Sequence, residues 1–146
     1  MGAHVIDMRI EGWQKELKEG IEEYKEIPFE WGRSDCIQFA GRVAARLLDY
    51  DLLTVANADD RYSTEEEAES IIINEYGGNI EAVLDELFTR RENEKYAQAG
   101  DLVSFEMGGK TAIGIIDNSG RYIAAKTIGG LVFLPFKSIK TAWEVK

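Results

Sequence analysis

Apolar residues recur at two different periods along the chain, one in each half. In the N-terminal half they return every three or four positions, with Lys and Glu between them, which is typical of amphipathic helices. The expected helices cover residues 6–24, 36–48, 63–76 and 79–88. From Gly100 onward, short apolar runs rich in β-branched and aromatic residues are separated by glycine turns, which predicts an antiparallel meander. Helices followed by strands indicate an α+β fold, with a helical N-terminal half packed on one side of a small, curled antiparallel sheet.

Local signals set several boundaries of the expected elements. Ser63 followed by Glu66 predicts a capping box, and Gly77-Gly78 is expected to end the helix that starts there. Asn79 is then expected to cap the fourth helix. Residues 49–62 show no sustained period, and we expect them to form a connecting loop.

Size and charge limit the classes of function. The 146 residues fit one domain, which we expect to span residues 1–146. The formal net charge of -10, with 27 acidic against 17 basic residues, argues against nucleic acid or an anionic membrane as a partner. No signal-like run opens the chain and no apolar run reaches the roughly 18 residues of a membrane-spanning helix, so we expect a cytoplasmic protein without membrane insertion. Residues 1–4, Met-Gly-Ala-His, are typical of a cloning remnant, and in that case the only imidazole lies outside the fold.

The counts of metal-binding residue types are low. One Cys and one His exclude an internal disulfide and a multi-cysteine zinc site. The sequence shows no calcium loop and no phosphate-binding loop of the GxxxxGK or GxGxxG kind. We therefore expect no metal and no cofactor.

The only cysteine, Cys36, lies where a loop is expected to become a helix. Ser34 or Asp35 can cap that helix, which puts Cys36 in its first turn, where free backbone N–H groups and the helix dipole lower a thiol pKa. A thiol at this place suits a papain-like nucleophile, and it also suits an inert core residue. The two interpretations differ in whether a base lies within hydrogen-bond reach.

Two segments are candidates for the walls of a pocket around the thiol. Trp31-Gly32 is the tightest point of the loop before Cys36, and Trp31 is either a lid on the pocket or, as we favour, a core residue. Arg61 and Tyr62 could line the pocket as well, although surface positions are commoner for such residues.

With these residues in place, the chain resembles the NlpC-type, papain-like cell-wall peptidases, and more closely the small NlpC-like proteins encoded among tail genes of phages and prophages. The resemblance runs from the first helix to Trp143. It rests on the order and spacing of Trp31-Gly32, Asp35-Cys36 with Phe39, residues 99–103, 113–116 and 120–125, and the pairs Gly130-Leu131, Leu134-Pro135 and Ala142-Trp143. It implies an NlpC/papain-like fold with Cys36 at the position of the nucleophile, and a pocket formed by Trp31, Gly32, Ala112, Ala124 and Lys126.

The resemblance also implies where a base should stand, and there the chain departs from the family. In active members the residue just before the Val/Ile-Gly-Ile strand core is the histidine base, and a second polar residue on the next strand orients it. These positions fall at Ala112 and Ala124. Ile37 and Gln38 follow the cysteine where active members usually have Ser-Gly. Because losing such a base removes several orders of magnitude of rate, the resemblance argues for the architecture and against ordinary peptidase activity.

Three functions remain open. The first is a non-catalytic NlpC-like module in phage or prophage tail assembly or at the tail tip, which would bind other tail proteins through the groove beside Cys36 or through sheet edges. The second is a cysteine hydrolase acting on peptidoglycan peptides or a related amide, with Asp35, Asp117 or Lys126 as the base. These three residues have commoner structural roles, as a helix cap, a turn former and a solvated strand-end charge. The third is an acidic, immunity-type protein that binds a basic partner.

Two structural consequences follow from these interpretations. We expect Cys36 to lie in the first turn of a helix that packs against the strand containing Ile113 and Ile115. We also expect slow alkylation of the thiol, because burial raises its pKa while the helix start lowers it.

Overall fold

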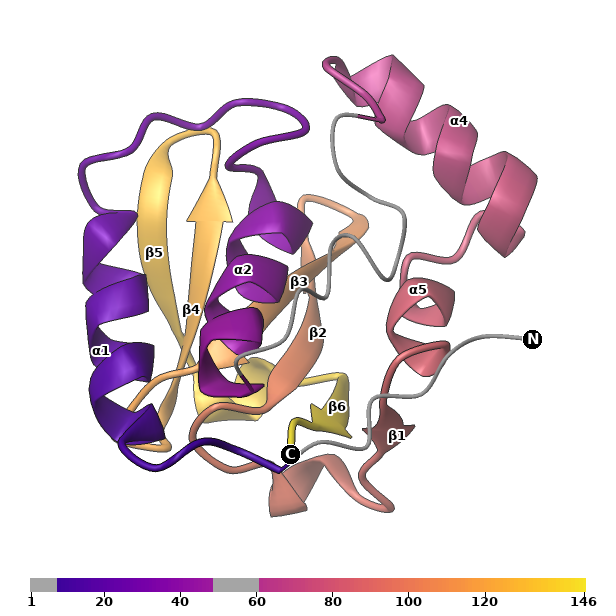
Figure 1. The fold of residues 1–146 in the computed structure, drawn as a ribbon. Helices are drawn as coiled ribbons and strands as arrows, with labels where there is room; N and C mark the ends of the chain where they lie inside the picture. Colours follow the sequence, from indigo (N-terminus) through magenta and orange to yellow (C-terminus); the bar gives the residue numbers. More distant parts are fainter. Residues whose placement is uncertain (1–7, 49–60) are drawn as a thin grey trace.

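A computed structural model describes residues 8–48 and 61–146 (Figure 1). Its helices are α1 (Trp13–Glu23), α2 (Cys36–Leu48), α4 (Glu65–Tyr76) and α5 (Glu81–Asp85), with the 3-10 helices η1 (Glu94–Tyr96) and η2 (Phe136–Ser138). Its strands are β1 (Thr89–Arg90), β2 (Leu102–Met107), β3 (Lys110–Ile116), β4 (Tyr122–Thr127), β5 (Gly130–Pro135) and β6 (Thr141–Glu144).

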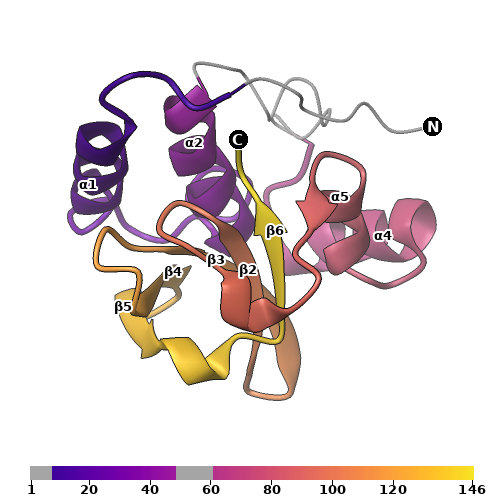
Figure 2. The same cartoon turned by 90° about the horizontal axis from the view of Figure 1, so that it is seen from below.

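All strands belong to one antiparallel sheet of six strands in the order β1-β6-β2-β3-β4-β5. Helices α1 and α2 lie together on one face of this sheet, and α4 lies to one side of α2 (Figures 1 and 2). Separate apolar clusters fill the two faces of the sheet, one of them beneath α2. The predicted α+β class, with helices on an antiparallel sheet, is therefore confirmed.

Helix α2 is the centre of the main core. Phe39, Val43 and Leu47 follow one another at i, i+4 spacing and are completely buried. They belong to the same cluster as Ile113 and Ile115 of β3. This confirms the prediction that the helix beginning at Cys36 packs against the strand with these two isoleucines.

Strand alternation divides β3 between the two clusters. Ile113 and Ile115 face α2, whereas Ile116 belongs to the cluster on the other face. Gly114 also points to that second face, since a Cβ added there would lie 2.5 Å from Cγ2 of Ile123. The second face is therefore closely packed at Gly114.

Several predicted boundaries were wrong. The first helix begins at Trp13, just after Gly12 with φ 81°, and not near residue 6, which lies outside the described residues. The capping box is shifted by one residue: Thr64, not Ser63, caps α4 by accepting from the backbone N–H of Glu67 at 3.1 Å. The Glu67 carboxylate in turn accepts from the Ser63 backbone N–H at 2.8 Å.

The fourth helix is also shorter than predicted. It covers Glu81–Asp85, although the Asn79 side chain does accept from the Glu81 backbone N–H near its start. The chain then forms the short strand β1, which pairs with β6. The sequence analysis predicted no strand in this part of the chain. The expected loop at 49–62 lies outside the described residues except for Arg61 and Tyr62. No helix within the described ranges is long and apolar enough to span a bilayer.

Candidate functional site

Asp35 caps α2, and both of its carboxylate oxygens accept hydrogen bonds. The residue is 1% exposed. One carboxylate oxygen accepts from the Gln38 backbone N–H at 2.9 Å, and the other accepts from the Gly32 backbone N–H at 2.8 Å and from the Tyr62 hydroxyl at 2.6 Å. Of the two capping candidates, Asp35 is thus the cap. The other candidate, Ser34, donates its hydroxyl to the Pro28 carbonyl.

Gly32 makes room for the chain that leads into α4. Its φ is +84°, and a Cβ at this position would lie 1.9 Å from the carbonyl oxygen of Tyr62. Only glycine allows this approach. Burial raises the pKa of the Tyr62 hydroxyl, and the Asp35 carboxylate acts in the same direction, so Tyr62 remains a hydrogen-bond donor to Asp35. Gly32, Asp35 and Tyr62 therefore lock two distant segments together.

Cys36 is the first residue of α2, as predicted, and it is partly accessible through a pocket. Burial among apolar atoms raises the pKa of its thiol from 9.0 to about 11, and the Asp35 charge adds to this effect. Backbone groups at Ile113 and at the helix start act in the opposite direction but are weaker. The thiol is therefore protonated at neutral pH, because desolvation outweighs the helix terminus here.

The two alanines carried over from the resemblance lie on opposite faces of the sheet. Ala124 belongs to the cluster beneath α2, whereas Ala112 packs against the cluster on the other face. Side chains alternate along a strand, so of the neighbours Ala112 and Ile113 in β3 it is Ile113 that points toward α2. The assignment of Ala112 to the pocket beside Cys36 is therefore not supported by the geometry.

The other base candidates lie elsewhere. Lys126 is 2% exposed and donates to the Tyr24 carbonyl at 2.5 Å, at the end of α1, so its expected solvated position is wrong. Burial lowers the pKa of Lys126, and the charge of Glu26 opposes this. Asp117 accepts from the backbone N–H and the hydroxyl of Ser119, which makes it a turn former. Neither residue lines the pocket that contains Cys36.

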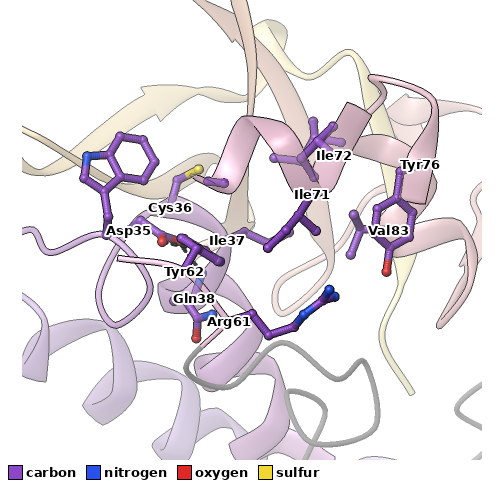
Figure 3. A pocket seen from close by; sticks show the side chains of 13 residues that line it. Asp35, Cys36, Ile37, Gln38, Arg61, Tyr62, Ile71, Ile72, Tyr76 and Val83 are labelled. Carbon is purple, nitrogen blue, oxygen red and sulfur yellow. Dashed lines mark hydrogen bonds between the residues drawn. The ribbon is translucent and has the colours of Figure 1, made fainter. Parts of the chain in front are cut away.

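An apolar pocket extends from Cys36 toward α4 and α5 (Figure 3). Its volume is about 110 Å³. Its lining combines aliphatic side chains with aromatic and polar ones. The lining consists of Trp31, Asp35, Cys36, Ile37, Gln38, Arg61, Tyr62, Ala68, Ile71, Ile72, Tyr76, Ile80 and Val83. Trp31 thus lines the thiol pocket rather than the core, against the preferred interpretation.

Sequence analysis missed the part that α4 and α5 play in this pocket. Ile71, Ile72 and Tyr76 were assigned to a helix but not to a site. The available signal was the run of three isoleucines at residues 71–73, which one buried helix face cannot accommodate. No group of three or more His, Cys, Asp or Glu side chains that could hold a metal occurs within residues 8–48 and 61–146.

The comparison with protein families gives one result. A family model described as a domain of unknown function, DUF6950, matches residues 8–145. A comparison with curated proteins found no match.

Proposed function

The chain belongs to the DUF6950 family, and from the site beside Cys36 we propose that it is a non-catalytic NlpC-like module of phage or prophage tail assembly. In this role it binds an apolar group of a partner protein in the pocket between α2 and α4. The association with tails rests on the resemblance of the sequence motifs. The absence of catalysis rests on the surroundings of the thiol.

The observation that carries the proposal is the lack of an available base near Cys36 among the described residues. Both Asp35 oxygens accept hydrogen bonds from the α2 start, from Gly32 and from Tyr62. The chain's only histidine is His4, outside the described residues. With a thiol pKa of about 11, about one thiol in ten thousand is ionised at pH 7. A nucleophile in this state does not support amide hydrolysis.

The composition supports a protein partner. A net charge of -10 is unsuited to nucleic acid or to an anionic membrane surface. The pocket offers a mainly apolar lining, which suits an apolar side chain presented by another protein. Tail components are the partners that the resemblance indicates.

A cysteine hydrolase is the second candidate, because the thiol lines the pocket at a helix N-terminus. Alkylation by iodoacetamide, followed against pH, separates the two functions. We expect the wild-type rate to rise only toward a thiol pKa of about 11 and to show no acid-side plateau. We also expect no digestion of muropeptides above background.

Two histidine variants test the geometry behind this expectation. Ile113→His places an imidazole on the face of β3 toward α2 and should lower the thiol pKa, whereas Ala112→His points to the other face and should leave it unchanged. Circular dichroism checks that both variants fold. Fast alkylation of the wild type at about pH 5 to 6, or muropeptide digestion that Cys36→Ala abolishes, would refute the non-catalytic function.

A further inference from the structure

The two edges of the sheet differ in length and charge. Strand β1, at one edge, has two residues, and its Arg90 donates to both carboxylate oxygens of Asp85 at 2.7 and 2.9 Å. Strand β5, at the other edge, has six residues, and residues 127–136 contain no charged side chain. Proteins normally protect an edge strand against pairing by making it short or charged. The β1 edge is protected in this way, whereas the β5 edge is not.

The outer side of β5 presents backbone groups to a further strand. Just past the ladder with β4, the Phe136 N–H donates to the Arg121 carbonyl at 3.0 Å, which fixes the alternation of bonds along β5. Hydrogen-bonded and non-bonded positions alternate in an antiparallel pair, so Leu131, Phe133 and Pro135 direct their backbone groups away from β4. Among the described residues no strand lies on that side of β5, which forms the outer end of the sheet in Figure 2. Leu131 and Phe133 each offer an N–H and a carbonyl there, and Pro135 offers only a carbonyl.

Exposed aromatic side chains adjoin this edge. Phe133 is 44% exposed and pairs in register with Ala124, so it shares with Ala124 the face of the sheet toward α1 and α2. Tyr122, two residues before Ala124, lies on the same face and is 48% exposed. Exposed apolar groups beside an open strand edge are typical of a surface that another strand covers.

The distribution of charge indicates which strand that is. The chain has a net charge of -10, but residues 118–143, which include β4 and β5, contain no Asp or Glu. Two copies of this chain repel one another least where carboxylates are absent. The β5 edge is therefore a surface through which two like-charged copies can approach.

The two ends of β5 also have neighbours of opposite charge. Arg121 and Lys137 are exposed and lie beside the C-terminal end of the strand. Near its N-terminal end, Lys126 of β4 donates to the Tyr24 carbonyl, which brings the exposed Glu26 to that end. An antiparallel arrangement of two copies places the basic end of one β5 strand at the end of the other where Glu26 lies.

We propose that β5 is a dimerisation edge, which pairs antiparallel with β5 of a second copy of this chain about a two-fold axis. In a register centred on Phe133, each Phe133 N–H donates to the Phe133 carbonyl of the second copy. Each Leu131 N–H donates to the Pro135 carbonyl of the second copy. Every N–H that the strand directs outward then has an acceptor, and the two sheets become one. This interface is separate from the pocket beside Cys36 and does not depend on the function proposed for it.

Analytical ultracentrifugation of the full chain tests the dimer. The mass should rise from 16.4 kDa at about 1 μM to nearly twice that value at about 100 μM. A mass that stays at 16.4 kDa over this range would overturn the proposal and leave a strand of a different protein as the occupant of the edge. A mass that continues to rise beyond the dimer would overturn the two-fold arrangement.

Hydrogen exchange of single amides, followed by NMR, tests whether the strand edge forms the interface. The Leu131 and Phe133 amides should exchange about tenfold more slowly at about 100 μM than at dilution, because pairing covers them. The Val132 and Leu134 amides, which bond to β4, should be protected equally at both concentrations. A dimer that leaves exchange at Leu131 and Phe133 unchanged would overturn the edge as its interface.

Two substitutions of exposed apolar residues by lysine make a matched pair. Phe133→Lys places two like charges opposite each other at the axis and should raise the dissociation constant at least about tenfold. Ile73→Lys, at a 63% exposed position on α4 at the opposite side of the domain, should leave it unchanged (Figures 1 and 2). Circular dichroism checks that both variants fold. Equal dissociation constants for Phe133→Lys and wild type would overturn the pairing centred on Phe133.

Discussion

Helices α1 and α4 have similar sequence signatures and different places in the molecule. Both were predicted as amphipathic helices from apolar residues at three- and four-residue spacing. In α1, Leu17, Gly20 and Ile21 are buried and the helix packs along α2. In α4 no residue is fully buried, and the apolar side chains border a cavity. Spacing alone therefore shows that a helix has an apolar face, but not whether that face is filled.

Two sequence features explain the difference. In α1, Gly20 lets the helices approach closely, since a Cβ there would lie 3.3 Å from Cγ1 of Val43. In α4, the three isoleucines at 71–73 are spread around the helix, and Ile73 remains 63% exposed. A narrow apolar face with a small residue gives close packing, whereas a broad and irregular one leaves space.

The largest loss of stability is expected at Gly32, where the segment leading into α4 makes its closest contact. Gly32→Ala would place a Cβ 1.9 Å from the Tyr62 carbonyl oxygen. Relief requires moving Tyr62 away from Asp35, so we expect a loss of about 4 kcal/mol in the free energy of unfolding. Urea unfolding measures this loss.

Gly12→Ala, just before α1, is the matched control, because it measures the cost of placing alanine at a positive φ without a steric clash. Gly12 also has a positive φ, +81°, but no atom lies within 4 Å of an added Cβ. The backbone strain alone should cost about 1 kcal/mol. Equal losses for the two variants would show that the approach of Tyr62 to Gly32 is not tight.

A pair of alanine substitutions tests the contrast between the two helices directly. Leu17→Ala in α1 removes a completely buried side chain and should cost about 3 kcal/mol. Ile72→Ala in α4 removes a side chain that already borders the pocket, so no new cavity is created and the cost should be about 1 kcal/mol or less. Equal losses in thermal or urea unfolding would mean that α4 is part of the core.

The sequence was sufficient for features set by local pattern. The spacing of apolar residues predicted the buried face of α2, which contains Phe39, Val43 and Leu47. The change to short apolar runs after Gly100 predicted the antiparallel sheet. Asp35 was one of the two residues expected to cap α2, because a short acceptor side chain before a helix satisfies its free N–H groups. These features depend on residues close together in the chain.

Apart from the packing of α2 against β3, which the resemblance implied, features that depend on distant segments could not be predicted. The hydrogen bond between Tyr62 and Asp35 and the placement of α4 over the thiol join segments that only the fold brings together. Lys126 was expected at a solvated strand end, but it is buried and donates a hydrogen bond to the Tyr24 carbonyl at the end of α1. Ala112 was placed beside the thiol from motif order, and the alternation along β3 puts it on the other face.

The last prediction concerns the thiol itself, which lies between the close-packed part of α2 and the pocket that α4 borders. Its pKa is raised from 9.0 to about 11 by burial. Below about pH 9 the folded and unfolded states both keep the proton, so the thiol does not affect stability. As the pH rises from about 9 to about 11, the unfolded state loses the proton first, and the folded state is destabilised.

The expected loss follows from this shift and tests how dry the space under α4 is. One pKa unit corresponds to about 1.4 kcal/mol, and the partial exposure of Cys36 reduces the effect, so wild type should lose about 2 kcal/mol more than Cys36→Ala between about pH 8 and pH 11. Urea unfolding of both proteins at each pH gives the difference in their free energies of unfolding. The contributions of the other titrating groups are the same in both proteins and cancel. Parallel pH profiles for the two proteins would mean that water reaches the sulfur freely, and that α4 does not cover the pocket.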